Sequence, residues 1–344
     1  MKPEKKTARY VLLKKLLYAF LYCFYLFLAV LFLLEVIYRY QWVDFFRTEL
    51  RVLNKPEVLR QADGRKTILI GGDSFTAFMP GYAQHLLEHN IPDHRVINSA
   101  VTGTSIVEAS FIMPKRIKAF HPDIFIYQIY AGNDLMDIRH EKNMNEISWV
   151  RNLYWWLSER IHVLWYVNYK AGQWKARLSP TEVPSGRDQF NVTLYSRREK
   201  LWAMADPFLI SNSVLLKNKR AQDLEILLQK LDEVIGQLKS GSQVYILVIP
   251  NKAQVNENYY DQLKAIGYQF DGGFSTDVDS YPFIEKIQSY FFNRSQVTVI
   301  NPLPALREHD MPGHRLYFAN DEHLNEKGHV VLASFIRPYL EERQ

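Results

Sequence analysis

Short apolar runs and longer amphipathic segments alternate along most of the chain after residue 65. The short runs are apolar, β-branched or aromatic, as buried parallel strands require, and they lie at 67–70, 95–98, 124–130, 244–249 and 297–300. Helical spacing of apolar positions marks the longer segments, at 104–120, 217–239, 281–292 and 326–342. This alternation predicts an α/β fold, a three-layer sandwich in which helices cover both faces of a central parallel sheet.

A different pattern opens the chain. Residues 16–34 form a run of nineteen without a charge, close to the ~20 apolar residues that cross a bilayer as a helix. We therefore expect one transmembrane helix at 16–38, a basic tail at 1–15 before it, a linker at 39–65 after it, and one domain at 66–344. A cleaved signal peptide is the alternative, although no small-residue cleavage site stands between Leu33 and Trp42.

Charge and cysteine content bear on location and partners. The first fifteen residues carry six basic side chains and one acidic one, and the other 329 residues carry 36 of each sign. Basic flanks stay on the cytoplasmic side of a membrane, so the tail is expected inside and the domain outside. A neutral domain gives no support for nucleic-acid binding. Cys23, in the predicted span, is the only cysteine, and an extracytoplasmic domain without disulfides fits a bacterial inner-membrane protein facing the periplasm.

One interval, 140–215, breaks the alternation and is interpreted as an insertion. It is rich in aromatic residues and holds six of the seven tryptophans: Trp149, Trp155, Trp156, Trp165, Trp174 and Trp202. Within it, 151–170 is predicted to form one amphipathic helix. Its aromatic face either packs on the sheet as a core or lid element, or contacts a membrane or a sugar chain.

The first predicted strand ends in Gly71-Gly72-Asp73-Ser74-Phe75. Open α/β sheets bind ligands beyond the carboxyl ends of their strands, and glycines there let the backbone turn sharply. The segment is neither a G-x-S-x-G elbow nor a phosphate-binding loop. Ser74 is therefore a candidate nucleophile, and a plain turn or helix N-cap is the alternative.

Two further strand ends carry groups that can donate hydrogen bonds. The second strand leads into Ser99-Ala100-Val101-Thr102-Gly103, where free N–H groups can stabilise a developing negative charge. The third leads into Ala131-Gly132-Asn133-Asp134, where Asn133 offers a side-chain N–H. Ordinary strand-to-helix loops remain the alternative for both segments.

A candidate general base stands near the end of the chain, in the segment 320–329. His323 follows Asp321 by two residues, and a carboxylate at that distance can orient an imidazole and stabilise its charged form. A metal site built from His323, His329, Asp321 and Glu322 is a possible second interpretation, but the H-E-x-x-H spacing is missing.

Taken in order, these four blocks resemble those of the SGNH or GDSL hydrolase family, over about residues 66–338 apart from the insertion. The resemblance implies a flavodoxin-like sandwich and a serine mechanism. It assigns the nucleophile to Ser74, the base to His323, and an oxyanion hole to Ser74, Gly103 and Asn133. In the family the orienting Asp usually precedes the His by three residues, a place held here by Asn320. The orienting role therefore passes to Asp321, in the shorter D-x-H form that resembles membrane-linked polysaccharide O-acetyltransferases.

The predicted function is that of a membrane-anchored serine esterase that removes ester-linked groups, acetyl groups in the first place, through an acyl-enzyme. Two alternatives stay open: an O-acyltransferase acting on an extracytoplasmic glycan, and a non-catalytic anchored module that binds a glycan or a protein. Expected partners are an ester or acylated glycan substrate, membrane lipid around the N-terminal helix, and a membrane protein; no cofactor, metal or nucleic acid is expected. Remaining polar residues are interpreted structurally, Asp73 and Asn98 as turn hydrogen-bonders and the histidines as surface or loop residues: His94, His121, His140 and His314.

Overall fold

The computed structural model describes residues 3–60, 64–88, 91, 94–139, 148–178 and 189–341. Of the features predicted above, His140 and the parts of the insertion at 140–147 and 179–188 lie outside the described residues. Residues 61–63 of the predicted linker lie outside them as well.

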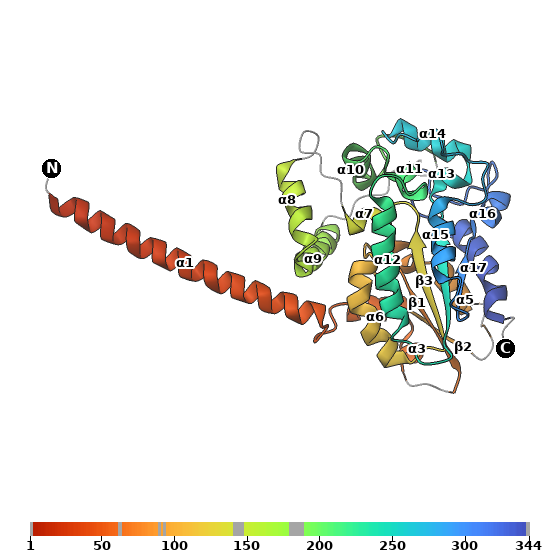
Figure 1. Ribbon diagram of the computed structural model, residues 1–344, viewed down its shortest axis with the longest axis horizontal. Coiled ribbons are helices and arrows are strands. Elements are labelled where there is room, and N and C mark those ends of the chain that lie inside the picture. Colours follow the sequence, from red (N-terminus) through yellow and green to blue (C-terminus); the bar gives the residue numbers. More distant parts are fainter. Residues whose placement is uncertain are drawn as a thin grey trace.

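Five parallel strands form the centre of the molecule, all within one residue of the predicted positions: β1 (Lys66–Gly71), β2 (His94–Asn98), β3 (Ile124–Tyr130), β4 (Gln243–Ile249) and β5 (Val297–Ile300). Nearly every residue of β1, β3 and β4 is buried, because helices cover both faces of the sheet. The predicted α/β sandwich is confirmed (Figure 1).

The strand order, β2-β1-β3-β4-β5, determines where a site can form. After β1 the chain moves outward to β2 and then returns to the other side of β1 for β3, so the sheet has a topological switch point between β1 and β3. Open α/β sheets bind ligands in the crevice at the carboxyl ends of the strands on either side of such a point. Ser74 follows β1 and Asn133 follows β3, so both lie at this crevice.

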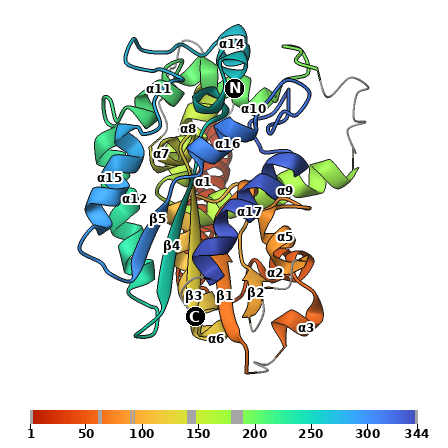
Figure 2. The same cartoon turned by 90° about the vertical axis from the view of Figure 1, so that its right-hand side faces the viewer.

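Helices form a layer on each side of the sheet: in Figure 1, α6 and α12 lie on one side of the strands and α17 on the other, and Figure 2 shows the strands side by side with α17 in front of them. One layer contains α6 (Ile106–Phe120), α12 (Arg220–Ile235) and α15 (Pro282–Phe291). The other contains α5 (Tyr82–Glu88) and α17 (Glu326–Glu341), with α16 (Leu303–His309) beside α17. Short helices at or near the carboxyl edge complete this part of the fold: α4 (Ser74–Ala77), α13 (Lys252–Val255) and α14 (Glu257–Ala265).

The N-terminal segment forms one long helix, α1 (Pro3–Arg39), which projects from the domain in Figure 1. Among the described residues, its part from Tyr10 to Arg39 is the one helix long and apolar enough to cross a membrane. Most side chains from Tyr10 onward are exposed, until Leu31 and the last turns contact the domain.

The segment 39–65 was predicted as a linker, and the structure corrects this interpretation. It contains α2 (Arg47–Leu53) and α3 (Pro56–Leu59), and Phe46 and Leu50 are buried in the main core. Asn54 pairs with the edge strand β2: its Nδ2 donates to the carbonyl of Asn98 at 2.7 Å, and its Oδ1 accepts the N–H of Asn98 at 2.8 Å. Residues 39–60 are therefore part of the folded domain.

The described part of the insertion, 148–178 and 189–215, contains four helices after the short α7 (Asp134–Ile138): α8 (Trp149–Ser158), α9 (His162–Leu178), α10 (Arg197–Ala205) and α11 (Leu209–Val214). The prediction of a single helix at 151–170 is wrong, because α8 ends at Ser158 and a new helix, α9, begins at His162. The break has a long-range cause: the carboxylate of Glu35 on α1 accepts the N–H groups of His162 and Val163 at 3.0 and 2.8 Å and so caps a new helix. The surface or loop interpretation of His94 is also wrong, since it is a buried residue of β2.

Candidate active site

The turn after β1 holds Ser74 at the first position of α4. Gly72 has φ +152°, and a Cβ there would lie 2.6 Å from Oε1 of Gln128, so the turn requires glycine. Asp73 caps α4 by accepting the N–H of Phe75 at 2.9 Å, and its own N–H donates to Gln128 at 3.1 Å. The predicted turn role of Asp73 thus has a geometric basis, and the turn presents the Ser74 hydroxyl to the crevice.

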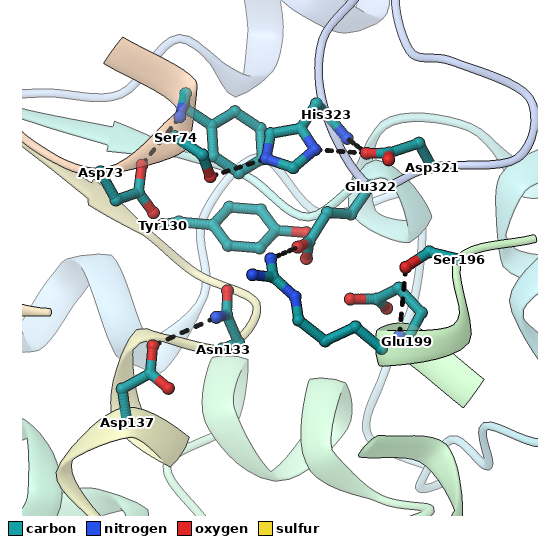
Figure 3. A network of polar contacts seen from close by, with 12 residues as sticks. Asp73, Ser74, Tyr130, Asn133, Asp137, Ser196, Glu199, Asp321, Glu322 and His323 are labelled. Atoms are coloured by element: carbon teal, nitrogen blue, oxygen red, sulfur yellow. Dashed lines mark hydrogen bonds and ion pairs between the residues drawn. The ribbon is translucent and has the colours of Figure 1, made fainter. Parts of the chain in front are cut away.

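A chain of hydrogen bonds joins the three residues that the sequence assigns to catalysis (Figure 3). Nε2 of His323 lies 2.7 Å from Oγ of Ser74. Nδ1 of the same ring is hydrogen-bonded to Oδ1 of Asp321, which also accepts the backbone N–H of His323 at 3.0 Å. This arrangement can remove a proton from the serine hydroxyl and stabilise the resulting imidazolium.

Aromatic rings fix the plane of the imidazole. The centroids of Phe75 and His323 are 4.7 Å apart, and Phe75 in turn lies 4.3 Å from Tyr130 at the end of β3. The hydroxyl of Tyr130 accepts a hydrogen bond from Asn251 at 2.8 Å, which ties this stack to the end of β4. The imidazole of His323 is therefore held by packing as well as by Asp321.

The pKa values of the pair are those of a carboxylate beside an imidazole. Burial raises the pKa of Asp321, but the hydrogen bond and the charge of His323 outweigh it and lower this pKa to about 2. Burial lowers the pKa of His323, but the hydrogen bond to Asp321 and the charge of Glu322 outweigh it, so the pKa stays above its ordinary value. Asp321 is thus ionised wherever His323 titrates.

Asn320, the residue at the usual place of the family's Asp, has a different role. Its Oδ1 accepts the N–H of Asn191 at 2.7 Å, its Nδ2 donates to the carbonyl of Gln189 at 2.8 Å, and its own carbonyl accepts the N–H of Ser196 at 3.2 Å. We call these three contacts the Asn320 clip. They join the loop that carries His323 to the insertion.

The predicted oxyanion groups line the same cavity as Ser74. Gly103 has φ +73°, and nothing lies within 4 Å of the place where its Cβ would be, so its backbone faces open space. Nδ2 of Asn133 donates to Oδ2 of Asp137 at 3.3 Å. Burial raises the pKa of Asp137 to about 8, so its carboxyl group is mostly protonated at neutral pH. The cavity has a volume of about 200 Å³.

Sequence reasoning missed the charged groups around this cavity. Arg198, on α10 of the insertion, lines it and donates to Glu322 at 3.0 Å, with its guanidinium 4.6 Å from the centre of the Trp202 ring. Burial and the neighbouring charge of Glu322 raise the pKa of Glu199 well above its ordinary value. No local motif surrounds these residues, and the concentration of tryptophans in the insertion was the one available signal.

Lys252 was also missed. It is fully buried behind the loop of the base, and its Nζ donates to the backbone carbonyls of Phe318 and Asp321, both at 3.1 Å, and of Ala319 at 3.5 Å. The rings of Tyr195 and Tyr259 lie 4.9 and 5.2 Å from this nitrogen. Burial lowers the pKa of Lys252 to about 7. Lys252 is therefore a positioning residue for the loop rather than a group that reaches the cavity.

The residues of the second, metal-binding interpretation lie in different surroundings. His329 is fully buried, stacks on Phe78 at 5.0 Å, and accepts the N–H of Tyr82 at its Nδ1 at 3.1 Å. Glu322 pairs with Arg198 as described. Across the described parts of the chain, no group of three or more His, Cys, Asp or Glu side chains is arranged to hold a metal ion.

All four blocks of the sequence resemblance thus meet at the switch point of a parallel sheet. The parallel sheet with helices on both faces agrees with the fold that this resemblance implies. No family model matches the chain, and no curated protein matches it in sequence.

Solved structures that are similar to this one include three enzymes, each with a low sequence identity and a low TM-score. A GDSL-like lipase from Bacteroides thetaiotaomicron is 9% identical, with 87% of this chain and 97% of that chain covered and a TM-score of 0.39. A lipase/acylhydrolase from Enterococcus faecalis is 12% identical, covering 81% and 96%, with a TM-score of 0.38. A catalytic mutant of an acetylxylan esterase from Geobacillus stearothermophilus is 14% identical, covering 81% and 95%, with a TM-score of 0.40.

Proposed function

We propose that the protein is a membrane-anchored serine esterase that acts on ester-linked acetyl groups through an acyl-enzyme at Ser74. The observation that carries this proposal is the hydrogen-bond chain from Ser74 through His323 to Asp321, with 2.7 Å between Oγ and Nε2. A non-catalytic binding module has no need for a hydroxyl, an imidazole and a carboxylate in this order.

The reaction has two halves. Oγ of Ser74 attacks the carbonyl carbon of the ester while Nε2 of His323 takes the hydroxyl proton. Collapse of the tetrahedral intermediate breaks the bond to the alcohol oxygen, which leaves with the proton from His323. Water then attacks the acyl-enzyme by the reverse route, and the acid is released with Ser74 restored. Asp321 stays ionised throughout and stabilises the imidazolium.

The negative charge on the carbonyl oxygen is stabilised, in this proposal, by the N–H groups of Ser74 and Gly103 and by the amide of Asn133. The two ends of an amide side chain have the same shape but opposite hydrogen-bonding roles. A protonated Asp137 can donate to Oδ1 of Asn133, which turns the two N–H bonds of this side chain toward Ser74. The raised pKa of Asp137 supports that arrangement at neutral pH.

Cavity size supports a short acyl group. About 200 Å³ beside Ser74 accommodates an acetyl ester and part of its alcohol, with Trp155 and Trp202 among the lining residues. Transfer of the acyl group to a sugar hydroxyl is the second candidate function. Residues of α8, α9 and α10 line the cavity and form a roof over Ser74. This roof favours transfer, because it shields the acyl-enzyme from water. Anchoring by α1 in a bacterial inner membrane, with the domain in the periplasm, completes the proposal.

The test uses full-length protein in detergent. Hydrolysis of a short-chain aryl acetate and labelling by a fluorophosphonate are compared in the wild type, Ser74→Ala and His323→Ala, with Ser289→Ala as the matched control. Ser289 is an exposed residue of α15, which contributes no residue to the lining of the cavity, so its variant should keep both signals. Both signals should be lost in Ser74→Ala and His323→Ala. In the wild type, both signals should survive treatment with a chelator.

A folded wild type without either signal would refute the esterase, and loss of activity with a chelator but not with Ser74→Ala would refute the serine mechanism. Adding sugars with free hydroxyl groups and measuring the ratio of transferred to hydrolysed acetyl groups separates the two candidate functions.

A further inference from the structure

Helix α8 has one exposed apolar face. Trp149, Val150, Leu153 and Trp156 have exposed fractions of 63%, 56%, 43% and 46%, and their spacing places them on one side of the helix. The opposite side is buried and includes Asn152 and Trp155. Exposed apolar patches of this kind mark contacts with a partner or a membrane.

The end of α1 fixes the position of this helix. Glu35 caps the N-terminus of α9, and Nη2 of Arg39 donates to the carbonyl of Arg160 in the turn between α8 and α9 at 3.0 Å. Glu35 and Arg39 also pair with each other at 2.7 Å. The α8–α9 corner is therefore bound directly to the last turns of the candidate membrane helix, and in Figure 1 both helices lie on the side of the domain that α1 leaves.

The depth of the α8–α9 corner relative to the membrane follows from the charge pattern of α1. The uncharged run 16–34 ends directly before Glu35. Nineteen helical residues at 1.5 Å each span about 28 Å, which matches the ~30 Å hydrocarbon thickness of a bilayer. When this run crosses the membrane, Glu35 lies at the boundary of the hydrocarbon, and so does the helix end that it caps.

The residues around this corner have the chemistry of a membrane interface. Tyr40, Trp42 and Val43, directly after α1, are exposed. The guanidinium of Arg160 lies 4.4 Å from the centre of the Trp156 ring and is itself half exposed. Tryptophan and tyrosine favour the headgroup region of a bilayer, and arginine beside them pairs with anionic headgroups.

We propose that α8 is an interfacial helix that rests on the lipid surface of the membrane crossed by α1, with its Trp149–Trp156 face among the headgroups. The inference depends on the proposal that α1 spans a membrane, but not on the esterase reaction. Its occupant is a phospholipid surface, because exposed aromatic side chains surround the end of the span and the half-exposed guanidiniums of Arg39 and Arg160 can pair with lipid phosphates. Tyr154, Trp155 and Ser158 on the other sides of α8 line the cavity of Ser74. One helix thus separates the lipid surface from the site.

The test uses the full chain, purified and reconstituted alone into nanodiscs of phosphatidylethanolamine and phosphatidylglycerol. An environment-sensitive fluorophore is attached to single cysteines introduced by Val150→Cys and Leu153→Cys in a Cys23→Ser background. Phe292→Cys is the control, since Phe292 is 85% exposed and follows α15, away from α1 in Figure 1. The natural Cys23 in the otherwise unchanged chain reports the span. Quenching is measured with lipids that carry a spin label near the headgroup for positions 150, 153 and 292, and with lipids labelled deep in the bilayer for Cys23.

We expect a blue-shifted emission and strong quenching at positions 150 and 153, and no quenching at 292. Quenching at Cys23 without quenching at 150 and 153 would overturn the proposal and keep the anchor, which leaves a protein partner as the occupant. Absence of quenching at Cys23 by lipids labelled deep in the bilayer would overturn both the interfacial position of α8 and the membrane span of α1. Equal quenching at 292 would also overturn it, because the contact would not belong to α8.

Discussion

Replacing Asp321 with asparagine separates the two ways in which this carboxylate acts on His323. Asparagine keeps the shape, and its Oδ1 can still accept the backbone N–H of His323 that lies 3.0 Å from the carboxylate, so the loop keeps its form. What is lost is the negative charge beside Nδ1. Serine hydrolases that lose this charge but keep the geometry slow by about a thousandfold or more in kcat, which corresponds to roughly 4 kcal/mol of transition-state stabilisation.

The same substitution changes the pH dependence, and its sign follows from the causes of the pKa shift. His323 acts as a base only when neutral, so kcat/KM falls as the pH drops through its pKa, which lies above the ordinary value of a histidine. The hydrogen bond to Asp321 and the charge of this residue raise that pKa, and burial lowers it. In Asp321→Asn the acid limb should therefore move to lower pH while the plateau falls.

Hydrolysis of a short aryl ester, measured as kcat/KM across pH, tests both effects. Asp261→Asn is the control, because it removes the same charge from an exposed position on α14 that does not line the cavity. Its acid limb should coincide with that of the wild type. The reasoning would be refuted by an Asp321→Asn enzyme within about tenfold of the wild type with an unmoved limb, since that is less than a positioned base contributes.

Two further substitutions test the surroundings of the site. Lys252→Met leaves the buried carbonyls of Phe318 and Asp321 without their donor. Each buried carbonyl left without a hydrogen bond costs about 1–3 kcal/mol, so the free energy of unfolding should fall by about 2–6 kcal/mol. The value of kcat should fall as well, because the loop of His323 loses its support. Chemical denaturation with the exposed Lys264→Met as control measures this, and an unchanged stability would contradict the positioning role. Burial raises the pKa of Asp137 from 3.8 to about 8, so this carboxyl group binds a proton more tightly in the folded protein than in the unfolded chain. The wild type should therefore lose stability as the pH rises from about 4 to about 8. Asp137→Asn should remove that loss, and parallel stability-versus-pH curves for the two proteins would contradict the shift.

Local patterns were sufficient to predict the sheet. Each strand lies where a short apolar run predicted it, because a parallel strand buried on both faces needs such a run. The short turn segments around Ser74 and His323 could also be recognised, since glycine, serine and histidine have strong local requirements there. The order of the strands, and with it the switch point, is not written in any single segment.

The features that sequence reasoning missed depend on contacts between distant residues. Lys252 and Arg198 lie in sequence surroundings without a motif, and they acquire their partners only when the loop of His323 folds against them. Glu35 splits the predicted helix of the insertion from a distance of more than a hundred residues. The segment 39–65 was interpreted as a linker from its polar residues, although Phe46 and Leu50 are spaced as a buried helical face.

The Asn320 clip makes the insertion and the loop of His323 one mechanical unit. Three hydrogen bonds attach residues 189, 191 and 196 to Asn320, three positions before the base. A shortened protein without the insertion would therefore lose the brace of its imidazole along with its roof. For the same reason, an alcohol that displaced α10 on entering the cavity would shift His323 relative to Ser74. Selection among acceptors can then act through the rate of the chemical step, without any direct contact between the rejected alcohol and Ser74, His323 or Asp321.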